Sequence, residues 1–139
     1  MAQDYWYDEQ SAQLGKEPIP SAWRWDDTYE AGIDLRSCQY ALVKFSAAKV
    51  VSLCTTSGEQ MCGILQNNPN SGLNAVVRFG GRSQVQGAKV FAAGALLTTN
   101  HSGRAFVAQS GDYYLCQAME LGSSSKKSLV IVRANAVLK

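Results

Sequence analysis

Short apolar segments alternate with clusters of turn-forming residues from residue 41 onward. Asn-Asn-Pro-Asn-Ser-Gly at 67–72 and Asn-His-Ser-Gly at 100–103 are two such clusters. The clusters recur about every eight to twelve residues with no helical period between them, which predicts an all-β body, a compact antiparallel barrel or sandwich. We expect strands at 41–45, 49–55, 60–66, 74–79, 84–91, 95–99, 104–109, 113–120 and 128–133.

Glycine sets two boundaries within this succession. The strand at 74–79 is expected to end at Gly80-Gly81, and Gly87 is a plausible position for a β-bulge in the strand that follows. Residues 90–97 form an apolar run that also allows one helical turn, because a short apolar run has no diagnostic period.

The first 40 residues show neither a strand period nor a helix period. Pro18 and Pro20 favour extended backbone around them, and a short helical turn near 26–32 fits the sequence. The chain is therefore divided into an extended N-terminal arm, residues 1–40, and a β-barrel-like body, residues 41–139.

Aromatic and acidic residues are concentrated in the arm. It holds all three tryptophans, four of six tyrosines and eight of eleven carboxylates, but only three of thirteen Lys and Arg, so its net charge is −5. The body has ten cationic and three anionic residues, a net charge of +7. Aromatic arms of this kind typically bind another subunit; the alternative is that the arm folds back over an open edge of its own barrel. The interface candidates are Tyr5, Trp6, Tyr7, Trp23, Trp25 and Tyr29.

The body offers little with which to build a catalytic site. His101 is the only histidine and lies in a turn beside Ser102, so a Ser-His-Asp triad with Asp112 is disfavoured. The body's three carboxylates are Glu59, Asp112 and Glu120, and the first two are expected to be turn residues. We expect no enzymatic activity and no cofactor.

The cysteines do not suggest a metal site or a disulfide framework. None of the four forms a Cys-x-x-Cys pair, and Cys54, Cys62 and Cys116 each lie in an apolar run, which favours buried free thiols. No apolar segment follows a basic start and none approaches the ~20 residues of a membrane span. We therefore expect a protein made in a reducing cytosol, with no membrane partner.

Nucleic-acid binding is the alternative that the basic body raises. Four cationic residues are candidates for one such surface: Arg78, Arg82, Lys89 and Arg104. Base stacking also needs exposed aromatic rings. The four phenylalanines Phe45, Phe79, Phe91 and Phe106 occupy strand positions, where core packing explains them.

Three local patterns resemble the small phage capsid decoration proteins, also called head-stabilising or cement proteins. They are the segments 62–69 with 75–81, then 87–90 with 92–99 and 103–105, and finally 111–120 with 129–132. The resemblance runs from about residue 43 to residue 133. It implies homotrimers on the outside of an icosahedral head, at local threefold positions.

The leading hypothesis is thus a virion protein that stabilises a phage head by bridging subunits of the major capsid protein, on the outer surface of the capsid. The alternative is a barrel-type binding module for nucleic acid or saccharide. The leading hypothesis needs no direct contact with nucleic acid.

Overall fold

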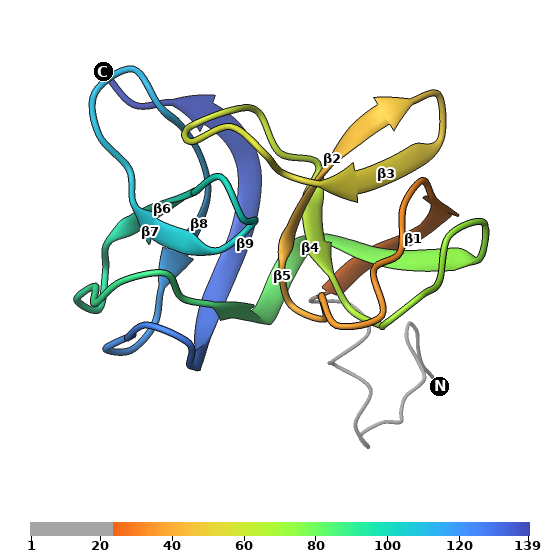
Figure 1. Ribbon diagram of the computed structural model, residues 1–139. Helices are drawn as coiled ribbons and strands as arrows, with labels where there is room; N and C mark the ends of the chain where they lie inside the picture. The colour runs from red at the N-terminus through yellow and green to blue at the C-terminus, as the bar shows by residue number, and fades with distance from the viewer. Residues whose placement is uncertain (1–23) are drawn as a thin grey trace, which may run out of the picture.

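The computed structural model describes residues 24–139, which form nine strands and no helix (Figure 1). The fold is therefore all-β, as the turn spacing predicts. The strands are β1 Arg24–Ala31, β2 Leu42–Ala47, β3 Val50–Leu53, β4 Gly63–Leu65, β5 Asn74–Gln86, β6 Leu96–Thr99, β7 Ala105–Val107, β8 Tyr113–Ala118 and β9 Lys127–Val137.

Five of these strands close into a barrel. They pair in the order β1-β3-β2-β4-β5, and β5 then pairs back onto β1. The closing pair is long: β1 residues from Arg24 to Glu30 oppose β5 residues from Gly81 to Asn74 in antiparallel register. Strands β1 and β3 pair in parallel, while all other strand pairs are antiparallel. In a closed barrel every strand pairs with a neighbour on each side, so no strand has an edge that is unpaired over its whole length.

Strand β5 continues beyond the barrel into a second sheet. Its last residues, from Gly81 to Gln86, pair with β9, and β9 leads on to β8, β6 and β7. Figure 1 shows β5 passing from the barrel on the right to this second sheet on the left. Gly81 pairs with both β1 and β9 and has a φ of 90°, a conformation that glycine adopts without steric cost.

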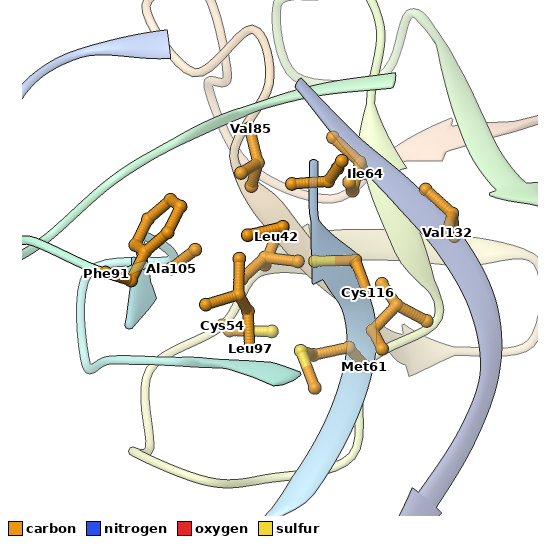
Figure 2. Close-up of a cluster of buried hydrophobic side chains, with 13 residues drawn as sticks. Leu42, Cys54, Met61, Ile64, Val85, Phe91, Leu97, Ala105, Cys116 and Val132 are labelled. Atoms are coloured by element: carbon orange, nitrogen blue, oxygen red, sulfur yellow. The ribbon is translucent and has the colours of Figure 1, made fainter. Parts of the chain in front are cut away.

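Two hydrophobic cores lie on opposite sides of β2 and β4. Leu42 and Ile64 oppose each other and belong to the larger core, which lies against the second sheet (Figure 2). Their neighbours Val43 and Leu65 point into the barrel core. Successive side chains of a strand point to opposite faces, so these two strands are buried on both sides and form the wall that the two cores share.

Most expected strands are present, but two expectations are wrong and one alternative is excluded. Gly80-Gly81 does not end a strand, because β5 runs through it as one 13-residue element. The run at 90–97 contains no helical turn; its end forms β6. The irregular backbone expected up to residue 40, with a helical turn near 26–32, is wrong for Arg24–Ala31, which is the barrel strand β1. Residues 1–23 of the expected arm lie outside the described residues.

Replacing Leu42 with Ala should lower the free energy of unfolding by about 2–5 kcal/mol, since it opens a cavity in the shared wall. Urea unfolding followed by circular dichroism measures this. The matched control is Leu73→Ala, because Leu73 is 59% exposed and surface changes usually stay within about 0.5 kcal/mol. Equal losses in both variants would contradict the two-core description.

Candidate functional site

Three aromatic residues continue the inner face of the barrel beyond its core. Each lies two residues from a buried core residue on its own strand, and so shares that residue's face. These residues are Tyr29 on β1, Phe45 on β2 and Phe79 on β5. Their core neighbours, two positions away, are Ala31, Val43 and Val77 respectively.

The rings form two contacting pairs. Tyr29 meets Phe45 edge to face, with ring centroids 5.0 Å apart and planes at 88°. Trp25 meets Phe79 at 6.2 Å with an interplanar angle of 38°. The exposed fractions are 61% for Trp25, 51% for Phe45 and 41% for Phe79. Exposed rings in contact are unusual on a monomer surface and mark a candidate binding site.

Gly80 makes room for the indole of Trp25. A Cβ atom at this position would lie 2.6 Å from Cε3 of Trp25, and its three nearest neighbours would all be atoms of that side chain. The indole therefore lies against the backbone of β5, where any larger residue would displace it.

Tyr29, Phe45 and Phe79 line a groove of about 850 Å³. Polar side chains complete its lining, among them Gln60 and Asn135. The amide nitrogen of Asn135 donates to the Met61 carbonyl, which fixes the orientation of the amide. Its Oδ1 is buried and has no hydrogen-bond partner among residues 24–139.

The two charged residues of the groove neutralise each other. Lys44 Nζ lies 3.2 Å from Glu59 Oε1, and Glu59 Oε2 accepts hydrogen bonds from the Thr55 and Thr56 amides at 2.7 and 2.8 Å. Burial raises the pKa of Glu59, but the amide bonds and Lys44 outweigh it, so the pKa lies below its usual value. The groove has aromatic and amide chemistry with no uncompensated charge.

Beside the groove, Asp26 neutralises Arg78. The guanidinium donates to both carboxylate oxygens at 2.7 and 3.1 Å, and also to the Arg82 carbonyl. One of the four cations that are candidates for a nucleic-acid surface is thus held in a bidentate ion pair.

Only two of the six interface candidates from the sequence lie in the part of the chain that the structure describes. Tyr5, Trp6, Tyr7 and Trp23 lie outside the described residues, whereas Trp25 and Tyr29 belong to β1 beside and within the groove.

The expectation that core packing explains all four phenylalanines is wrong for Phe45 and Phe79, which are exposed, and right for Phe91, which is 2% exposed. Both residues lie at the end of the barrel, where the alternation of inward-facing and outward-facing side chains continues beyond the last buried residue of each strand. Counting positions outward along each strand from its core residues could have identified these exposed aromatic rings.

The residues considered for catalysis act as turn residues. His101 is exposed in the turn that Asn100 Oδ1 holds by accepting from the Ser102 and Arg104 amides. Asp112 accepts from the Gln109 amide, and Glu120 similarly accepts from the Leu129 amide.

Metal ligands and reactive thiols are not gathered anywhere in the described part of the chain. No group of three His, Cys, Asp or Glu side chains there can hold a metal ion. All four cysteines are free thiols, and burial raises the pKa of Cys54, Cys62 and Cys116 to about 12. This confirms the expected free thiols; Cys62 is only partly buried. Within residues 24–139, no helix is long and apolar enough to cross a membrane.

A second exposed apolar site lies on two loops of the other half of the molecule. Phe91 and Gly122 exchange backbone hydrogen bonds of 3.2 and 2.9 Å and tie the loop before β6 to the loop before β9. The ring of Phe91 reaches into the larger core and leaves no space for a Cβ at Gly122. Next to this anchor, Val90 and Leu121 are 68% and 73% exposed. We call this site the loop tip.

The chain matches no protein-family model and no curated protein. Among solved structures, its fold is similar to the head fiber gp8.5 N base in bacteriophage phi29. The TM-score is 0.61 with 15% sequence identity, and the match covers 78% of this chain and 93% of that one. A likeness at this identity shows the fold alone.

Replacing Glu59 with Gln should destabilise the protein near pH 7 and less in acid. Because the folded-state pKa lies below the usual 4.5, the carboxylate stabilises the fold above that value, and the contribution is lost as the pH falls through the folded-state pKa. Urea unfolding at about pH 7 and pH 3 compares the variant with the native protein. The control is Gln60→Ala, an exposed uncharged neighbour whose effect should not change with pH. A Glu59→Gln loss of equal size at both pH values would contradict this assignment.

Proposed function

We propose that this chain is a structural virion protein that binds the outside of a phage head as a homotrimer and bridges neighbouring major capsid subunits. The observation that carries the proposal is the likeness of fold to the base of a phage head fiber. The sequence patterns that resemble decoration proteins lie in the same β-body and support the same role.

The loop tip is the best candidate for the contact with the capsid. Val90 and Leu121 are apolar side chains that water surrounds, and Phe91 holds their loops against the core. A rigid apolar contact loses little conformational freedom when it binds, so more of its interaction energy appears as affinity.

Stabilisation of the head follows from repetition rather than from one strong contact. A trimer offers three copies of each contact, and linked contacts raise the overall affinity by about 10²–10⁴ when all can engage together. Copies that bind across the interface between two major capsid subunits then resist the separation of those subunits. No cofactor and no catalytic step is needed, which agrees with the structural use of every carboxylate in the body.

Replacing Leu121 with Asp should reduce occupancy on heads while leaving the fold intact. A carboxylate at an apolar contact loses its hydration, whereas in the free protein it stays in water. Heads purified without this protein are incubated with native or variant protein and imaged by electron cryomicroscopy. Native protein should appear as threefold clusters on the outer surface, and the variant should be sparse.

The matched control for this experiment is Leu73→Asp, because Leu73 is also an exposed leucine but lies beside the barrel rather than at the loop tip. It should bind as native protein does. Native protein that leaves the heads bare would overturn the proposed function, and full occupancy by Leu121→Asp would exclude the loop tip as the contact.

Removing residues 1–23 should leave a folded protein that binds heads more weakly. The cut precedes β1 and removes Tyr5, Trp6, Tyr7 and Trp23; aromatic anchors typically contribute about 2 kcal/mol or more each at an interface. Removing residues 1–40 instead deletes β1, which opens the barrel between β3 and β5 and should unfold it. Circular dichroism and occupancy on heads measure both effects. A 1–23 deletion that binds as tightly as the full chain would remove the segment from the interface.

A further inference from the structure

The barrel-end groove has a chemistry that contact with a capsid does not require. Its walls are the rings of Tyr29, Phe45 and Phe79, and Trp25 extends this surface through its contact with Phe79. The groove lies at the end of the barrel, with Asn135 of β9 in its lining, whereas the loop tip belongs to the loops before β6 and β9.

The aromatic surface is built to stay in place although water reaches it. Trp25 is 61% exposed, yet one side of its indole lies on the backbone of Gly80, and its ring contacts that of Phe79 in a tilted arrangement. Tyr29 and Phe45 hold each other edge to face at 5.0 Å. A fixed, exposed aromatic face offers a ligand large contact area at low entropic cost.

Charge limits what such a ligand can be. Both charged groups of the lining are used in the Lys44–Glu59 pair, and the nearby Arg78 is held by Asp26. A phosphate or carboxylate ligand would lose its hydration without gaining a free cation in return. The groove therefore favours a neutral ligand.

Hydrogen-bonding groups lie among the rings. Gln60 presents an exposed amide, and Asn135 brings a carbonyl oxygen that lacks a donor within residues 24–139. Because an unsatisfied buried acceptor costs about 1–3 kcal/mol, a ligand hydroxyl that donated to Oδ1 of Asn135 would remove this cost. A lining that contains both aromatic rings and side-chain amides matches a ligand that has flat C–H faces and equatorial hydroxyls.

We infer that this groove binds a neutral, gluco-configured oligosaccharide. The faces of a pyranose ring of this kind carry mainly C–H groups, which pack on the electron-rich face of an aromatic ring. Its equatorial hydroxyls point outward around the ring and can form hydrogen bonds with amides of the lining such as Gln60 and Asn135. The volume of about 850 Å³ falls within the roughly 300–1,000 Å³ typical of pockets for ligands of this size.

The test is a titration of the full chain with the neutral trisaccharides maltotriose, cellotriose and N-acetylated chitotriose, followed by the NMR signal of the Trp25 indole N–H. That signal is assigned by its disappearance in Trp25→Ala, and affinities of the variants are measured by calorimetry. At least one trisaccharide should shift it, with a dissociation constant that is insensitive to salt. Trp25→Ala and Phe79→Ala should each weaken binding by about tenfold or more.

Gly80→Ala is the sharpest variant, because it keeps every ring and displaces only the indole of Trp25. It should weaken binding as Trp25→Ala does. The matched control is Leu121→Asp, which should bind saccharide as native protein does although its occupancy on heads should be reduced. Phe79→Ala should conversely still bind heads, so the two functions fail separately.

Four results would overturn the inference. The first is the absence of any shift at about 10 mM of each trisaccharide, a concentration that would detect even very weak binding. The second is binding that survives in Gly80→Ala and Phe79→Ala. The third is a salt-dependent preference for the oligonucleotide dT10, which would make the groove a single-strand site. The fourth is loss of head binding in Phe79→Ala, which would make the groove a capsid contact instead.

Discussion

The backbone pairing of β5 on both of its halves holds the molecule together. Its first half closes the barrel against β1 and its second half begins the other sheet against β9. A strand that serves two sheets must turn between them, and Gly81 supplies that turn in a conformation that other residues adopt only with strain. The double burial of β2 and β4 follows, because the second sheet wraps around the outside of the barrel wall that they form.

The same turn positions the aromatic groove. Gly80 precedes it and lies beneath Trp25, while Phe79 is the last large side chain of β5 before the glycines. The pair of glycines thus connects the architecture to the surface chemistry: one residue carries the strand from barrel to sheet, and the other provides the space for the indole.

The sequence predicted the strands that alternate against one core or are apolar on both faces. It missed β1, because Arg-Trp-Asp-Asp-Thr-Tyr-Glu-Ala is polar or charged at most positions and, among residues 25–31, only Ala31 is fully buried. Its pairing depends on β5, some fifty residues away, and no local pattern encodes a partner at that distance. The groove was missed for a related reason, since the sequence pattern around a strand phenylalanine is the same whether the ring is buried in a core or exposed at the end of a barrel.

Closure of the barrel by β1 and β5 also determines the order in which the chain can fold. The ion pair of Asp26 with Arg78 spans 52 positions, and such distant contacts carry a larger loop-closure entropy than the β2–β3 hairpin does. During synthesis β1 leaves the ribosome first, yet its antiparallel partner follows only after β2, β3 and β4. The hairpin can therefore form early, whereas the ring closes late, and the first strand of the barrel is among the last to be incorporated.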